Sequence, residues 1–276
     1  MELFTVNQQT CNRDGVCAAV CPMGIIDWAP GALPVPAMDA ANLCIRCGHC
    51  VAVCPTGSFS HRDMPVDVCP PVRPELRCSS EQGEQFLRAR RSIRVYRDTP
   101  VPRDTLAKLI DIARHAPSGI NSQGVGWLVL GDRQELRKLA GMVIDWMEWM
   151  RAETPEAAKA LHLDRTVERW RAGHDVILRG APAVIVAHAE TANRMAATTC
   201  TIALTYLELA TTVLGLGGCW AGYFNAAVNA YPPMAEALGL PPGRQCHGAM
   251  MVGYPKFAYR RLPVRNPSSI HWRMGT

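Results

Sequence analysis

The feature that most constrains this chain is the stretch CIRCGHCVAVCP, in which Cys44, Cys47, Cys50 and Cys54 precede Pro55. This spacing is the C-x2-C-x2-C-x3-C-P pattern with which thiolates hold iron-sulfur clusters. An upstream stretch, CNRDGVCAAVCP, repeats the pattern with only three cysteines. Because the surrounding residues are too few for an ordinary core, the two runs predict a small domain stabilised by clusters.

The two runs also predict how the ligands are shared. In proteins with two such runs, the fourth cysteine of each run ligates the cluster of the other run. One four-iron cluster is therefore expected on Cys21, Cys44, Cys47 and Cys50. The other is expected on Cys11, Cys17, Cys54 and the occupant of the vacant second position. Structural zinc is the alternative for C-x2-C pairs, but a zinc site has no need of two C-x3-C-P units.

Asp14 occupies the vacant position. In one interpretation its carboxylate ligates the fourth iron through oxygen, a harder donor than thiolate. In the other, NRDG only forms a turn and the second position is empty. The second cluster is thus expected to be either 4Fe-4S with an aspartate ligand or 3Fe-4S. Both interpretations predict that it differs from the first cluster in potential and stability.

Composition excludes several classes of partner. The chain has 276 residues, of which 48% are hydrophobic, so it can bury a sizeable core. Its 29 Lys and Arg residues against 24 Asp and Glu residues give a mild net charge of +5, which indicates no nucleic-acid partner. The N-terminal MELFTVNQQT shows no export signal, and the apolar stretch 201–218 contains four threonines, too polar for a membrane span. With seven of twelve cysteines at ligand spacings, we expect a reducing cytoplasm.

Sequence patterns divide the chain into three segments. Residues 1–64 hold the cysteine runs, and residues 65–85 are expected to be a linker because PVDVCPPVRP disfavours a helix interior. Residues 86–276 alternate between helical and strand patterns, which predicts an α+β fold. Strands are expected at 126–131, 182–189 and 248–254, and helices around 133–151, 155–179 and 195–215.

Four segments of the third region occur in an informative order, namely RARRSIRVYRD (88–98), HAPSGINSQGVGW (115–127), GLGGCWAGYF (215–224) and GYPKFAYRRLPVRNP (253–267). Together they resemble the nitroreductase family of FMN enzymes over about residues 86–276, and the cluster domain resembles the ferredoxin-fused branch of that family. The resemblance implies a ferredoxin-like domain followed by an FMN domain with a mixed sheet flanked by helices. It also implies a homodimer with FMN in the interface.

The resemblance further implies which residues contact FMN. They are Arg90, Arg91, Ser92, Arg94, Pro117, Ser118, Asn121, Gly217, Gly218, Arg260 and Arg261. RRSIR, expected in one helical turn or a turn-like stretch, supplies guanidinium and hydroxyl donors suited to phosphate, although a solvated basic face is the alternative. The basic residue at Arg94 would lie by the flavin pyrimidine, Asn121 at the isoalloxazine edge, and the amides of Gly217 and Gly218 near N5 and O4. Arg261 is preferred over Arg260 as a second phosphate contact.

Taken together, these patterns predict an oxidoreductase in which flavin N5 is the reacting atom and no protein general acid is required. Electrons would pass from a low-potential donor through the clusters to FMN and on to a nitroaromatic, a quinone or an activated alkene. Reduced ferredoxin fits as donor, because direct hydride transfer from NAD(P)H would make the clusters redundant; NAD(P)H stays an alternative. The other function class is an electron-transfer module that serves a partner redox protein.

Two further groups of residues have open interpretations. Residues 141–180 fall where the family has its variable lid, and Trp146, Met147, Trp149 and Met150 line either an acceptor pocket or a core stripe. The cysteines outside the runs lack ligand spacing and are expected to be small buried residues. They are Cys69, Cys78, Cys200, Cys219 and Cys246.

Overall fold

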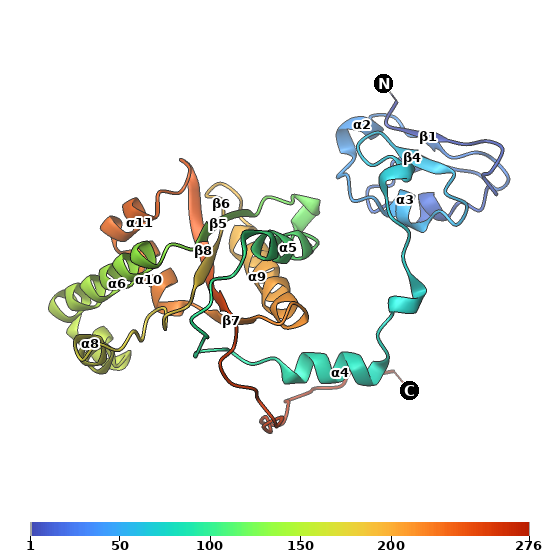
Figure 1. Cartoon of the computed structure of the whole chain (residues 1–276). Helices are drawn as coiled ribbons and strands as arrows, with labels where there is room; N and C mark the ends of the chain where they lie inside the picture. Colours follow the sequence, from blue (N-terminus) through green and yellow to red (C-terminus); the bar gives the residue numbers. More distant parts are fainter. Residues whose placement is uncertain (1, 276) are drawn as a thin grey trace. The chain divides into compact units, whose positions relative to one another are not determined.

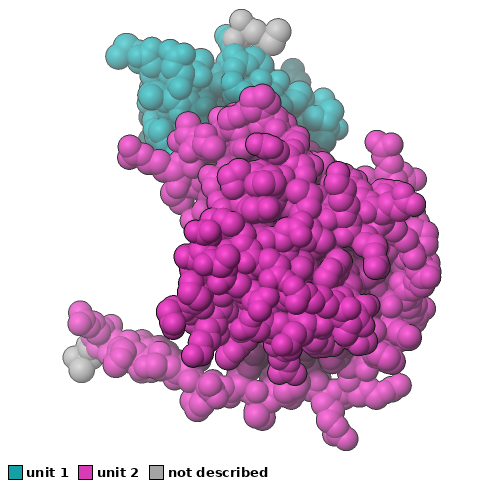
Figure 2. Space-filling view, turned by 90° about the vertical axis from the view of Figure 1, so that its left-hand side faces the viewer, with its two compact units in different colours: residues 1–77, 119–122 teal, residues 78–118, 123–276 magenta. Residues whose placement is uncertain are grey.

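The computed structural model describes residues 2–275, which fall into two compact units (Figure 1). Residues 1–77 with 119–122 form the first unit, and residues 78–118 with 123–276 form the second (Figure 2). Both cysteine runs lie in the first unit. Across the part of the chain that the structure describes, no helix is long and apolar enough to span a membrane.

The first unit consists of short elements. Strand β1 (Phe4–Val6) pairs antiparallel with β4 (Phe59–His61), and β2 (Ile26–Asp27) pairs antiparallel with β3 (Val35–Pro36). Its helices are α1 (Val16–Ala19), α2 (Ala40–Leu43) and α3 (His49–Val53). Gly15 and Gly48 precede α1 and α3 with φ of 72° and 74°, a left-handed conformation that glycine adopts without steric penalty.

The apolar core of the first unit is small. The rings of Phe4 and Phe59 lie 4.4 Å apart between centroids, and Ile25, Ile26 and Val51 pack around them. Cys17 belongs to this core, and Cys21, Cys44, Cys50 and Cys54 pack against it. This arrangement places the cysteine sulfurs at the edge of the apolar cluster rather than in solvent.

A helix begins inside the segment expected to be a linker. The short 3-10 turns η1 (Val66–Val68) and η2 (Pro74–Leu76) are followed by α4 (Ser80–Ala89). The backbone N–H of Gln82 donates to Ser79 Oγ at 3.1 Å, and the N–H of Ser79 donates to Gln82 Oε1 at 2.9 Å. This capping box satisfies two backbone donors, so Ser79 and Gln82 start a helix where proline content alone indicated extended chain.

The second unit contains a four-stranded sheet in the order β5-β6-β8-β7. Its strands are β5 (Gly126–Leu130), β6 (Ala183–Glu190), β7 (Gly217–Trp220) and β8 (Arg244–Gly253). Its remaining helices are α5 (Arg103–Ala113), α6 (Arg133–Glu153), α7 (Pro155–Ala160), α8 (Leu163–Arg171), α9 (Ala196–Val213), α10 (Gly222–Ala230) and α11 (Pro232–Leu238). The α+β class is confirmed, and all three strand pairs are antiparallel where a mixed sheet was expected.

Helices cover both faces of this sheet (Figure 1). On β6, Val184 and Val186 pack into a core with α6, α8, α10 and α11, whereas Ile185 and Ala187 pack with α5 and α9. Because both faces are buried, β6 is an uninterrupted apolar run rather than an alternating one.

Two elements differ from the sequence expectation. The helical stretch expected around 155–179 is divided at His162, which has φ of 54°, and α8 ends at Arg171. Strand β7 was not among the expected strands. Gly215 does follow α9 with φ of 68°, but the chain then forms β7. A Cβ on Gly217 would lie 2.2 Å from Ile93 Cγ1, so this strand needs a glycine there.

Candidate functional site

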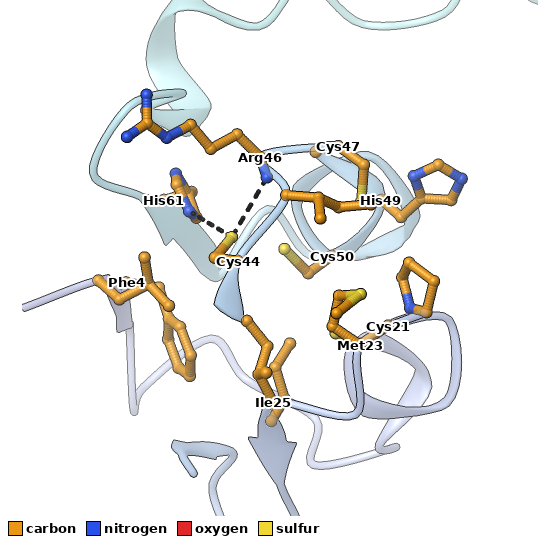
Figure 3. A pocket seen from close by; sticks show the side chains of 15 residues that line it. Phe4, Cys21, Met23, Ile25, Cys44, Arg46, Cys47, His49, Cys50 and His61 are labelled. Atoms are coloured by element: carbon orange, nitrogen blue, oxygen red, sulfur yellow. Dashed lines mark hydrogen bonds between the residues drawn. The ribbon is translucent and has the colours of Figure 1, made fainter. Parts of the chain in front are cut away.

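A cavity in the first unit is lined by four thiols that come from both cysteine runs (Figure 3). They are Cys21, Cys44, Cys47 and Cys50. Three of them surround the start of α3, and the fourth lies in the turn after α1. Phe4 and Ile25 belong to the apolar side of the lining. The cavity thus brings together the four thiols that the crossed pattern assigns to one cluster, and their ligation of iron stays a prediction.

The electrostatics of the thiols show the same crossed grouping. Burial raises the pKa of the Cys50 thiol to about 11, and the charges of Cys47 and Cys21 add to the rise. Burial likewise raises the pKa of Cys17, with further contributions from Cys54 and Cys11. The last cysteine of each run therefore lies beside the other run. A metal or cluster bound here must displace the protons of these thiols.

Cys54 has a different local environment. Burial raises the pKa of this thiol, but the Thr56 hydroxyl and the backbone N–H groups of Phe59, Thr56 and Ser58 lower it by more. Thr56 Oγ1 lies 3.7 Å from Cys54 Sγ. These donors favour the thiolate, which is the form that ligates metals.

Asp14 lies exposed between Cys11 and Cys17. Its Oδ1 accepts a hydrogen bond of 3.2 Å from the backbone N–H of Val16, the first residue of α1. This bond is the turn contact of the NRDG interpretation. A carboxylate has about four lone-pair sites, so the same side chain retains the capacity to ligate iron. Both interpretations of Asp14 therefore stay predictions.

In the second unit, RRSIR is extended rather than one helical turn. Helix α4 ends at Ala89, and Arg90 has ψ of 132°. The reason is a backbone bond of 2.9 Å from the N–H of Ile93 to the carbonyl of Gly218, which holds the segment beside β7. Gly217 and Gly218 are both buried in that strand.

An arginine-lined cleft lies between this segment and the C-terminal tail. Its lining is Leu87, Arg88, Arg90, Arg91, Leu262, Pro263, Val264 and Arg265. Arg260 and Arg261, the tail residues expected at the phosphate, are exposed and lie outside this lining, whereas Arg265 belongs to it. Arg265 was missed even though it stands in the same basic tail sequence, because sequence order alone does not show which guanidinium faces the cleft.

Arg90 is held by a carboxylate. Its Nη1 lies 2.8 Å from Oε1 of Glu208, whose side chain is 8% exposed, against 26% for Arg90. Trp220 Nε1 donates to the other carboxylate oxygen of Glu208 at 3.3 Å. A guanidinium has five N–H donors, so Arg90 retains donors for an anion in the cleft. The sequence carried no sign of this pair, since its members are 118 positions apart.

Arg94 lines a second cavity, together with Arg179, Cys219, Trp220 and Tyr223. Burial raises the pKa of Cys219, an effect that the charges of Arg94 and Arg179 partly offset. Cys219 is therefore a protonated, buried thiol, as expected for a small core residue. Arg179 was not singled out from the sequence, although ILRGAP (177–182), which contains it, directly precedes β6.

The residues of PSGINSQ divide between the two units. Pro117 and Ser118 belong to the second unit, where Ser118 Oγ accepts a bond of 3.0 Å from the N–H of Gln123. Asn121 belongs to the first unit, where its Nδ2 donates to the carbonyls of Ile45 and Arg46 at 3.1 and 2.8 Å.

Trp146 and Met147 are 3% and 0% exposed within the core around α6, so the core interpretation holds for them. One expectation is wrong. Cys69 and Cys78 are exposed, not buried, because they flank the short turns before α4. Cys200, Cys219 and Cys246 are buried as expected.

Comparison with sequence families gives two matches. The model of the Nitroreductase family matches residues 87–254, more than half of the chain. The model of the 4Fe-4S dicluster domain matches residues 9–59, the stretch that holds both cysteine runs.

Individual proteins are similar to about two thirds of this chain. A protein of Archaeoglobus fulgidus, described as an NADH dehydrogenase/NAD(P)H nitroreductase, is 25% identical over 199 residues, 69% of this chain and 97% of that protein. A nitroreductase with bound FMN from Bacteroides fragilis has a TM-score of 0.56 at 19% identity and covers 69% of this chain and 98% of its own. A nitroreductase with bound FMN from Desulfitobacterium hafniense has a TM-score of 0.57 at 19% identity, with coverages of 69% and 97%.

Proposed function

Because this chain belongs to the nitroreductase family and begins with a 4Fe-4S dicluster domain, we propose that it is an FMN-dependent oxidoreductase fed by iron-sulfur clusters. Electrons from a low-potential donor would pass through the clusters to FMN and reduce a nitroaromatic, a quinone or an activated alkene. The observation that carries this proposal is the crossed grouping of the thiols in the same chain as the nitroreductase domain.

The residues of the first unit fit the clusters. Four thiols from two runs share one cavity with an apolar side, and Cys thiolates are the ligands that iron-sulfur clusters require. In this proposal, the second cluster is held by Cys11, Cys17, Cys54 and, at the fourth iron, Asp14 or no protein ligand. When bound, the clusters supply one-electron transfer and FMN supplies the exchange between one-electron and two-electron chemistry.

The second unit fits a flavin phosphate. Guanidinium groups of Arg90, Arg91 and Arg265 line one cleft, and arginine is suited to bidentate contact with phosphate. Glu208 keeps the Arg90 side chain in a fixed orientation. The similar structures from Bacteroides fragilis and Desulfitobacterium hafniense contain FMN. We place the phosphate at this cleft, with Arg94 toward the flavin ring.

A homodimer is part of the proposal. Helix α9 packs one face into the core, while Tyr206 and Val213 on it are 40% and 69% exposed. We propose that these two exposed apolar side chains lie in the interface between two copies of the chain. A second copy of this chain is the partner that the family implies.

The test uses the full chain and a one-electron donor. In the double variant Cys47→Ser/Cys50→Ser, which removes two lining thiols, we expect FMN to stay bound while turnover of a nitroaromatic with dithionite-reduced ferredoxin is lost. The matched control is Cys69→Ser/Cys78→Ser, which changes two exposed cysteines outside the cavity. The measurements are FMN content, iron content and anaerobic turnover.

Three outcomes separate the alternatives. Unchanged turnover in the cluster variant would refute the electron relay. Equal turnover with NADH as sole donor in wild type and variant would identify NAD(P)H as the direct donor to FMN. Wild-type protein that reduces no small acceptor but exchanges electrons with a partner redox protein would favour the electron-transfer module.

A further inference from the structure

His61 is a buried polar residue that belongs to neither cysteine run. It lies at the cavity lined by Cys21, Cys44, Cys47 and Cys50, here called the cluster cavity. It is the last residue of β4, pairs in register with Phe4 of β1 and is 3% exposed. Its side chain lines the same cavity as Cys21, Cys44 and Cys50 (Figure 3). The strand pairing fixes the backbone of His61, so its ring has a defined position beside the thiols.

Both ring nitrogens of His61 have a partner. The backbone N–H of Asp63 donates to Nδ1 at 3.0 Å, so Nδ1 is an acceptor and carries no proton. In a neutral imidazole the other nitrogen then carries the proton. That nitrogen, Nε2, lies 3.5 Å from Sγ of Cys44. The geometry therefore makes His61 a donor to the Cys44 sulfur.

Cys44 has a second donor. The backbone N–H of Arg46 points at the same sulfur at 3.4 Å, and Figure 3 shows the two contacts converging on Sγ. Hydrogen bonds to cluster sulfurs are one of the factors that set the reduction potential of an iron-sulfur cluster. Reduction adds negative charge to the cluster and its thiolates, so an N–H donor stabilises the reduced form more than the oxidised form.

We infer that His61 is a positioning residue that raises the reduction potential of the cluster held by Cys21, Cys44, Cys47 and Cys50. This inference rests on the proposed ligation by Cys44. It assigns to this cluster a side-chain N–H donor from outside the ligand motif. The Asp63 backbone N–H holds the His61 ring in orientation, as hydrogen bonds hold metal-ligating side chains.

The first experiment compares midpoint potentials of the anaerobically purified holoprotein by EPR-monitored redox titration. His61→Phe fills the ring's place without a donor, whereas His61→Gln retains an amide donor and an acceptor for the Asp63 N–H. The matched control is His49→Phe, which changes an exposed histidine that lines the same cavity. Iron content is measured on every sample.

We expect His61→Phe to shift one of the two couples to a more negative potential, by about tenfold in its reduction equilibrium or about 59 mV for one electron. His61→Gln should recover most of the shift, and His49→Phe should keep the wild-type value. Equal potentials in all four proteins at equal iron content would overturn the inference and leave the proposed function intact. Wild-type protein without a cluster signal would overturn both.

A second measurement does not depend on the folding of His61→Phe. Wild-type protein labelled with 15N-histidine is reduced, and nitrogen coupling to the cluster is recorded by pulsed EPR. We expect a 15N coupling that disappears in labelled His61→Gln but persists in labelled His49→Phe. A wild-type spectrum without histidine coupling, or a coupling lost only in His49→Phe, would contradict the role of His61.

Discussion

The pair formed by Arg90 and Glu208 gives a prediction with a definite asymmetry. The carboxylate side chain is 8% exposed and the guanidinium side chain 26% exposed, with 2.8 Å between Nη1 and Oε1. Removing one partner of a buried ion pair leaves an uncompensated charge and costs about 3–5 kcal/mol. The two single variants should differ because water reaches Arg90 more easily than Glu208.

For Arg90→Met, the remaining carboxylate keeps only the neutral donor of Trp220. We expect a loss of about 3 kcal/mol in the free energy of unfolding, at the lower end of the range because the pair is not fully sealed from water. For Glu208→Gln, the amide oxygen still accepts a hydrogen bond and Arg90 regains hydration. We expect a loss of about 1 kcal/mol, near the value of one hydrogen bond.

The double variant Arg90→Met/Glu208→Leu removes both charges of the pair. Replacing a buried ion pair by apolar residues is often neutral or stabilising, so the double variant should be more stable than Arg90→Met alone. The assay is urea unfolding of the FMN-free protein followed by tryptophan fluorescence. The circular dichroism spectrum of each folded variant should match that of the wild type. A larger loss in Glu208→Gln than in Arg90→Met, or a double variant less stable than Arg90→Met alone, would refute the reasoning.

Three further predictions follow from single residues. Gly217→Ala should destabilise the second unit by about 1–3 kcal/mol through overpacking against Ile93, a loss measurable by urea unfolding and absent if the strand can shift. Burial and the charge of Arg244 lower the pKa of His188 in the folded chain. As the pH drops below about 6.5, the unfolded chain therefore takes up a proton at this histidine before the folded chain does, and the folded state should lose stability. In thermal melts recorded at several pH values, His188→Gln should show a smaller loss than the wild type. Asp14→Cys should hold about eight irons per chain by iron assay, and a lower count would contradict a ligand position there.

The cluster cavity could be predicted from the sequence because the cysteines that line it stand close together within two short runs. Ligand spacing within each run determines which thiols meet around α3, and the structure brings Cys21 to the thiols of the second run. Strands β5, β6 and β8 were predictable for the same reason, since buried apolar runs mark them.

The rest depends on contacts between distant positions. Strand β7 has two glycines and no apolar pattern, and it is recognisable only beside Ile93 and β8. The pairing of Arg90 with Glu208 joins positions 118 residues apart. His61 lies 17 residues beyond Cys44, outside the motif, so only the pairing of β4 with β1 shows that its ring lines the cavity.

The two cysteine runs are repeats of one pattern, yet the structure surrounds them with different groups. The second run has a cysteine at its second position, whereas the first has Asp14, an oxygen ligand at most. Cys44 has the ring donor of His61, whereas Cys54, which we propose to ligate the other cluster, has the hydroxyl of Thr56. Since ligand type and hydrogen bonding both set the potential, two clusters built from one repeat should have separate potentials. A separation of this kind gives electrons a preferred order of transfer, which two identical clusters would not provide.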